Sequence, residues 1–186
     1  SGSGKSTLVD LILGMLTPTG GEILIDGINP SVLARDIPGF MAYVPQNIHI
    51  FNGSLEENIT LQKNGTNDQV KLNQAIEKSS LKKMVDSFSD GSSRFLGEGG
   101  NNLSGGQKQR IGIARALYTE PKFLVLDEAT SSLDGVTEME ITEFLRNIKG
   151  EVTSVVIAHR LTSILGCDRV IYLEDGAVRG IGTLQQ

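Results

Sequence analysis

The apolar residues of this chain follow two different spacings, one typical of helices and one typical of buried strands. Over residues 6–16 they recur every three or four positions, which predicts a helix that ends at the turn cluster 17–21. Residues 123–126 are apolar without interruption, as expected for a strand that is buried on both faces of a parallel sheet. Between residues 54 and 88 the pattern is helical and more polar, so we expect helices there.

Predicted strands and helices alternate along much of the chain, which indicates the α/β class. The predicted strands are 22–26, 40–44, 123–126, 154–158 and 170–173, and the main predicted helices are 6–16, 107–118 and 136–149. We therefore expect a core with a mostly parallel sheet, formed by residues 1–50 and 119–186. Residues 51–118 are predicted to form an inserted helical subdomain.

Composition narrows the class of protein further. The chain has 186 residues, of which 39% are hydrophobic and 21% are charged, values typical of a globular domain that buries its own core. The formal net charge of −5, without a basic tail or stripe, argues against nucleic acid as a partner. The single cysteine, Cys167, cannot form an internal disulfide, which fits a reducing compartment. No apolar run approaches the ~18 residues that a membrane span needs.

The first seven residues are a candidate phosphate-binding loop: Ser1, Gly2, Ser3, Gly4, Lys5, Ser6 and Thr7. Its glycines allow backbone N–H groups to converge on phosphate oxygens at a helix N terminus, where the helix dipole favours anions. Lys5 adds a positive charge for the β and γ phosphates, and the Ser6 hydroxyl can ligate Mg²⁺. The first glycine of the pattern G-x-x-x-x-G-K-[ST] would fall two positions before Ser1, so we expect a fragment whose supporting strand lies upstream.

Two carboxylates, Asp127 and Glu128, follow the apolar run at 123–126. Paired carboxylates often mark a solvated turn, but the C-terminal ends of buried strands are where open α/β sheets bind ligands. At such a position Asp127 would hold Mg²⁺, commonly through water. Glu128 would orient and polarise an attacking water molecule.

A second glycine-led helix start lies between these two motifs, in Ser104, Gly105, Gly106 and Gln107. Ser104 can act as the N-cap of the helix that follows, and the simplest interpretation is a capped turn. A chain with one phosphate loop does not need another anion site for the same nucleotide. A second site is useful if it serves a nucleotide that another domain holds.

These motifs together resemble those of an ABC transporter nucleotide-binding domain, and they occur in that family's order. The resemblance also includes Gln46 in the sequence YVPQ, Asp134 in the sequence SSLD, and His159 in the sequence IAHR. It implies the P-loop NTPase fold, with a RecA-like core and an inserted helical subdomain that carries the signature Ser104–Gln107.

The resemblance also implies roles for residues whose types alone are uninformative. In that family the glutamine at Gln46 touches Mg²⁺ and senses the transmembrane partner, and the histidine at His159 contacts the γ-phosphate. Asp134 would act with the signature on the nucleotide of the other copy. Taken alone, Gln46 is a polar residue at a strand end and His159 is a loop histidine.

The function implied by the resemblance is an ATPase motor that uses ATP and Mg²⁺. Two such domains, identical or different, would bind two nucleotides head to tail, each between Lys5 of one domain and Ser104–Gln107 of the other. Residues 51–59 and 96–100 resemble the segments of exporters. The resemblance to exporters implies that this domain works with transmembrane partner domains. It also implies a location on the cytoplasmic face of a membrane, here the cell inner membrane.

Two alternatives remain open from the sequence. ATPases of DNA repair and chromosome maintenance share the signature, but they insert long coiled coils, and the stretch between Gln46 and Leu103 is short and lacks heptads. The second alternative is a nucleotide-binding module that does not hydrolyse ATP in isolation. The presence of Glu128 and His159 argues against an inactive parent protein.

Overall fold

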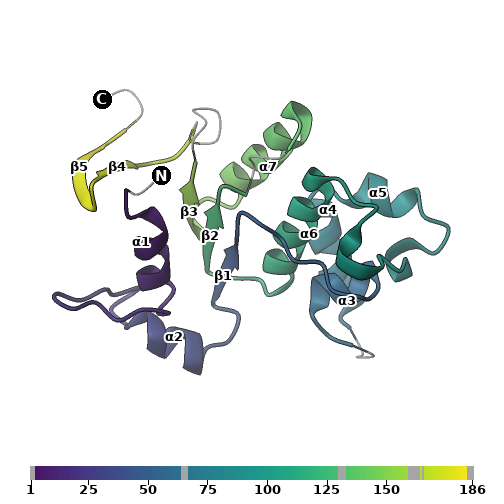
Figure 1. The fold of residues 1–186 in the computed structure, drawn as a ribbon, viewed down its shortest axis with the longest axis horizontal. Coiled ribbons are helices and arrows are strands. Elements are labelled where there is room, and N and C mark those ends of the chain that lie inside the picture. Colours follow the sequence, from purple (N-terminus) through teal and green to yellow (C-terminus); the bar gives the residue numbers. More distant parts are fainter. Residues whose placement is uncertain (1–2, 64–66, 130–132, 159–163, 165, 184–186) are drawn as a thin grey trace.

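Three parallel strands form the central sheet of the computed structural model, which describes residues 3–63, 67–129, 133–158, 164 and 166–183. The strands β1 (Met41–Val44), β2 (Phe123–Asp127) and β3 (Thr153–Ile157) pair in that order, so β2 has a parallel neighbour on each side (Figure 1). The first four residues of β2 are buried and only Asp127 is partly exposed. The uninterrupted apolar run is therefore a buried strand of a parallel sheet, as predicted, and it is the middle strand of the three.

Helices cover both faces of this sheet, namely α1 (Lys5–Ile12) on one face and α6 (Gly105–Tyr118) with α7 (Gly135–Asn147) on the other. Val9 of α1 packs with Phe123 and Val125 of β2. Leu124 and Leu126 point to the opposite face and join a cluster that includes residues of α6 and α7. Side chains of β2 thus alternate between two apolar environments, as they must in a parallel sheet covered on both sides. The predicted α/β class is confirmed.

Short helices follow the sheet strand β1 and pack together at one end of the molecule (Figure 1): α3 (Leu55–Thr60), α4 (Gln69–Lys78), α5 (Lys82–Asp86) and the 3₁₀ turns η1 (Gly91–Ser93) and η2 (Glu98–Gly100). Leu55 and Leu72 are fully buried there, in one cluster with Ile111 and Ala114 of α6. Ile113, which lies between these two residues on α6, belongs instead to the cluster that contains Leu124 and Leu126 of β2. Helix α6 therefore separates two hydrophobic cores, which supports a helical subdomain, although the boundaries at residues 51 and 118 remain a prediction.

The prediction of a strand at residues 22–26 is wrong. In its place a single bridge pairs Ile25 with Ile28 around Asp26 and Gly27, whose φ angles are 51° and 77°. Two successive residues with positive φ are typical of a tight two-residue hairpin turn. The chain therefore reverses after one bridge, before a strand can extend.

One α-helix and one strand of the described residues were not predicted, namely α2 (Pro30–Asp36) and β5 (Ala177–Gly182). Helix α2 begins with a proline after Asn29, whose side chain accepts a hydrogen bond from the Ser31 N–H at 2.9 Å. Strand β5 pairs antiparallel with β4 (Val170–Glu174) in a separate two-stranded sheet. Within the described ranges, none of the helices has the length and apolar character needed to cross a bilayer.

The side chain of Asn58 stabilises the turn that joins the sheet to the helical region. It is fully buried, accepts a hydrogen bond from the Phe51 N–H at 3.1 Å, and donates to the carbonyls of Phe51 and Ser54 at 3.1 and 3.0 Å. Asn58→Ala would remove all three side-chain hydrogen bonds and leave the N–H and the carbonyl of Phe51 without this partner. We expect a loss of roughly 2–4 kcal/mol in the free energy of unfolding.

Urea denaturation measures this loss, and Asn73→Ala on the exposed face of α4 is the matched control. The control removes the same side chain at an exposed helix position, where we expect a change within about 0.5 kcal/mol. Equal midpoints for the two variants would contradict the role of Asn58.

Candidate nucleotide site

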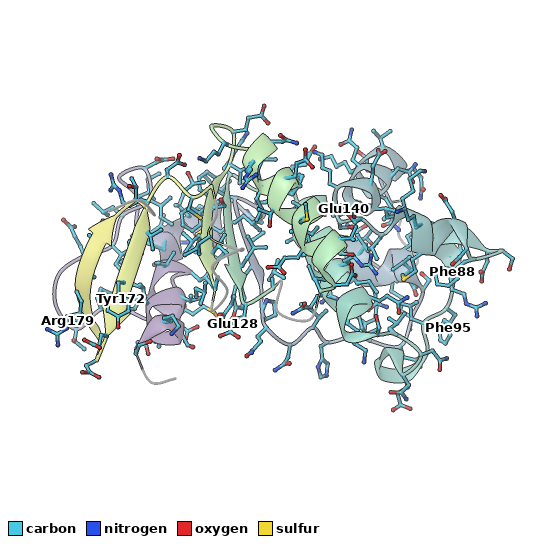
Figure 2. All side chains as sticks on the ribbon, turned by 90° about the horizontal axis from the view of Figure 1, so that it is seen from above. Phe88, Phe95, Glu128, Glu140, Tyr172 and Arg179 are labelled. Atoms are coloured by element: carbon cyan, nitrogen blue, oxygen red, sulfur yellow. The ribbon has the colours of Figure 1, made fainter. Side chains whose placement is uncertain are left out.

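The backbone of Glu128 has an unusual conformation directly after β2. Its φ is 50°, which is uncommon for a residue other than glycine. Its N–H donates to the carbonyl of Ile157 at the end of β3, at 3.0 Å, and the buried side chain of Gln109 on α6 donates to the Glu128 carbonyl at 3.4 Å. Strained residues persist where their surroundings hold them, and they concentrate at functional sites. Glu128 is thus held from two sides at the edge of the sheet (Figure 2).

Gln46 lies in the loop after β1 and reaches the carboxylate of Glu128. Its Nε2 donates to Glu128 Oε2 at 2.9 Å. The two residues come from the ends of adjacent strands, which parallel pairing brings to the same edge of the sheet. Ile48, two residues beyond Gln46, packs against α6 at Gly112, where a Cβ atom would lie 2.3 Å from Ile48 Cδ1. The loop that carries Gln46 therefore depends on a glycine in α6.

Asp127 has a partner that the sequence did not reveal. The hydroxyl of Tyr43 on β1 donates a hydrogen bond to Asp127 Oδ2 at 3.2 Å. Partial burial, together with the charge and hydrogen bond of Asp127 and the charge of Asp10 on α1, raises the pKa of Tyr43 to about 12. The phenol therefore stays protonated at neutral pH and remains a donor. Only its position three residues before Gln46 could have drawn attention to it.

The phosphate-loop residues lead directly into α1. Ser1 and Gly2 lie outside the described residues. Gly4 is the N-cap of α1 with φ 87°, and no side chain caps this end of the helix. Lys5 Nζ donates to Ser3 Oγ at 2.8 Å, and the Ser3 carbonyl accepts from the Gly176 N–H at 3.3 Å. The first-turn residues Ser6 and Thr7 are exposed. An uncapped helix start with a lysine at its first position suits an anion.

The signature residues form a capping box at the start of α6. Ser104 Oγ accepts from the Gln107 N–H at 3.2 Å, and Gln107 Oε1 accepts from the Ser104 N–H at 2.8 Å. The expected N-cap role of Ser104 is confirmed. Gly105 and Gly106 occupy the first turn between them, where the N–H groups of a helix have no partner within the helix. The same helix reaches Glu128 through Gln109 about one turn later.

Asp134 caps a helix. It precedes α7, accepts from the Thr137 N–H at 3.1 Å, and accepts from the Thr137 hydroxyl at 2.8 Å. These hydrogen bonds lower the pKa of Asp134 and keep it ionised. His159 and the serines at 131 and 132 lie outside the described residues. The predicted contacts of Asp134 and His159 with nucleotide therefore stay predictions.

The chemistry of the predicted metal ligands fits Mg²⁺. Ser6 in the first turn of α1, Gln46 after β1 and Asp127 at the end of β2 offer a hydroxyl, an amide and a carboxylate oxygen, and Mg²⁺ prefers oxygen ligands. In the part of the chain that is described, no group of three or more His, Cys, Asp and Glu side chains could hold a metal. Mg²⁺ in phosphate-handling proteins commonly uses one or two protein ligands and completes its shell with water and phosphate oxygens. A site with few oxygen ligands from the protein is therefore what we expect for Mg²⁺ here.

Comparison with known proteins identifies the family. The model of the family "ABC transporter" matches residues 1–131. An "ABC-type transporter fsqE" of Aspergillus fumigatus is 40% identical over 192 residues, which cover all of this chain and 15% of that protein. An "ATP-dependent lipid A-core flippase" of Ralstonia nicotianae is 38% identical over 98% of this chain and 31% of its own length.

A solved structure agrees with these sequence matches. The structure of a bacterial Atm1-family ABC exporter with ATP bound superposes with a TM-score of 0.89 and 34% sequence identity. The match covers 98% of this chain and 32% of that protein, so the chain spans less than a third of the length of these relatives. With the carboxylate pair at the end of β2, the uncapped start of α1 and the capping box of α6 in one fold, the chain belongs to the ABC transporter family.

Proposed function

We propose that this chain is the domain of an ABC exporter that binds and hydrolyses ATP. The observation that carries the proposal is the hydrogen bond between Gln46 and Glu128 at the C-terminal edge of a parallel sheet, beside Asp127. In open α/β sheets this edge is where ligands bind. Membership of the family supports ATP hydrolysis in general, and we assign the separate roles in that reaction to residues of this chain.

Each part has a separate task. The first-turn amides of α1 and the charge of Lys5 hold the phosphates. Ser6, Asp127 and Gln46 would hold Mg²⁺, which when bound neutralises charge on the β and γ phosphates. Glu128 accepts a hydrogen bond from the attacking water and aligns it with the γ-phosphorus. His159 would donate to the γ-phosphate.

The contact between Gln46 and Glu128 is compatible with both proposed roles of Gln46. The bond uses the Nε2 donor of Gln46, so the Oε1 oxygen of the same amide stays available as a metal ligand. One side chain can thus touch the base and the metal at once. A shift of the Gln46 loop would then change its contact with Glu128 and its contact with the metal together. This behaviour suits a residue that senses a partner domain.

The signature is proposed to act on the nucleotide of a second domain. Its capping box uses the amides of Ser104 and Gln107, so the amides of Gly105 and Gly106 are the ones left for an anion. The partners are then a second ABC ATPase domain, identical or different, and transmembrane domains. No nucleic acid is involved, and the site of action is the cytoplasmic face of a membrane.

The proposal is tested by titrating the intact protein with ATP in a calorimeter, with Mg²⁺ present. Lys5→Ala removes a charge-assisted contact to phosphate, and we expect the affinity to fall at least about tenfold. Lys82→Ala, at the exposed start of α5, removes the same charge away from the site and serves as the control. An affinity that Lys5→Ala leaves at the control value would contradict a phosphate site at α1.

A further inference from the structure

Tyr43 occupies the face of the sheet that α1 covers. The side chains of β1 alternate, with Ala42 and Val44 in the cluster beneath the sheet and Met41 in the cluster that contains Val9 of α1. Tyr43 stands opposite Val125 of β2, which belongs to the α1 cluster as well. Tyr43 and α1 are therefore on one face of the sheet.

Asp127 emerges on the same face, because it lies two residues after Val125 on one strand. The Tyr43 hydroxyl holds its Oδ2 at 3.2 Å. A hydroxyl has one proton to donate, so the hydrogen bond fixes one carboxylate oxygen and leaves Oδ1 to face other ligands. The side chain at the open end of β2 is thus restrained in rotation by the neighbouring strand.

The Tyr43 hydroxyl does not need this hydrogen bond to avoid being buried without a partner. Tyr43 is 38% exposed, so water could satisfy its hydroxyl. An exposed hydrogen bond adds little to stability, because it replaces one with water. Orientation is different, since a ligand must be held within a fraction of an ångström and a small angle of its working position. The consequence of the bond is therefore expected in metal binding rather than in folding.

We propose that Tyr43 is a positioning residue for Asp127, which orients the carboxylate so that its free oxygen serves the Mg²⁺ that accompanies ATP. The inference rests on the proposed function, because it takes Asp127 to be a metal ligand. Ligand orientation by a neighbouring hydrogen bond commonly changes metal affinity by about 10–100-fold in sites with several protein ligands. Here the protein supplies few ligands, and we expect a smaller effect.

Tyr43→Phe is the test, because it keeps the ring and removes only the hydroxyl. We expect binding of Mn²⁺ in the presence of ATP, measured by the electron paramagnetic resonance signal of free Mn²⁺, to weaken about three- to tenfold. ATP affinity measured with EDTA should stay within about twofold, because no metal is then involved. Tyr172→Phe on β4 is the control, because the Tyr172 hydroxyl also donates to a carboxylate, that of Glu174, at 3.3 Å (Figure 2).

A third variant, Asp127→Asn, separates this inference from the proposed function. If Asp127→Asn weakens Mn²⁺ binding and Tyr43→Phe matches the Tyr172→Phe control, the positioning role is wrong and the metal site stands. If Asp127→Asn has no effect on Mn²⁺ binding, the assignment of the metal site itself fails. A Tyr43→Phe variant that loses ATP affinity equally with and without metal would overturn the inference too, since the hydroxyl would then support the fold of the site.

Discussion

Glu128→Gln is expected to lower ATP turnover in the intact protein by about 10²–10⁴-fold while ATP binding persists, because a positioned base contributes that much to catalysis. Glutamine keeps the shape of the side chain and an oxygen that can accept the 2.9 Å hydrogen bond from Gln46 Nε2. The local structure should therefore survive. What is lost is the negative charge that polarises the attacking water.

Steady-state phosphate release measures the turnover, and calorimetry measures the binding. Glu140→Gln on the exposed surface of α7 makes the same chemical change away from the sheet edge and is the control (Figure 2). We expect the control to keep the rate of the unchanged protein. If Glu128→Gln turns over ATP within about threefold of that rate, the loss is too small for the removal of a general base. That result would contradict the catalytic role of Glu128.

The elements that could be predicted from sequence are those with a strong local signal. The apolar run at 123–126 was identified as a buried parallel strand because two-sided burial leaves no polar positions. The start of α6 was identified from Ser104, since a capping serine before glycine and glutamine satisfies exposed amides within a few residues. Both signals depend on neighbours in sequence.

The wrong and missed elements depend on weaker or more distant contacts. Residues 22–26 have an apolar pattern suited to a strand, yet Asp26 and Gly27 turn the chain back after one bridge. Strand β5 contains two glycines, which lower its propensity, and it forms because β4 offers a partner across the turn. Helix α2 did carry a signal, the pair Asn29 and Pro30, but it is only seven residues long.

Side chains that meet across the fold were the hardest to predict. The contact of Tyr43 with Asp127 spans 84 positions, and it exists because the register of β1 against β2 sets Tyr43 opposite Val125. The support of Glu128 by Gln109 similarly requires α6 to pack beneath the end of β2. Motifs could nominate Gln46, Asp127 and Glu128, whereas the residues that hold them in place needed the tertiary structure.

Mixing two inactive variants of the intact protein is expected to restore ATPase activity. Lys5→Ala removes the phosphate contact at α1, and Ser104→Arg places a bulky side chain at the start of α6. If each nucleotide lies between Lys5 of one copy and Ser104 of the other, each variant alone damages both sites of its dimer. In a mixed dimer both lesions fall in one site and the other site is whole.

Equal mixing should then recover about a quarter of the full rate in a homodimer whose sites turn over independently, because half of randomly paired dimers are mixed and each has one whole site. A mixture of Lys5→Ala with the Lys5→Ala, Ser104→Arg double variant is the control, because none of the three kinds of dimer that it forms contains a whole site. Phosphate release before and after exchange of subunits measures both. Normal hydrolysis by Ser104→Arg alone would mean that Ser104 is only a helix cap, because the arginine would then stand where no nucleotide binds.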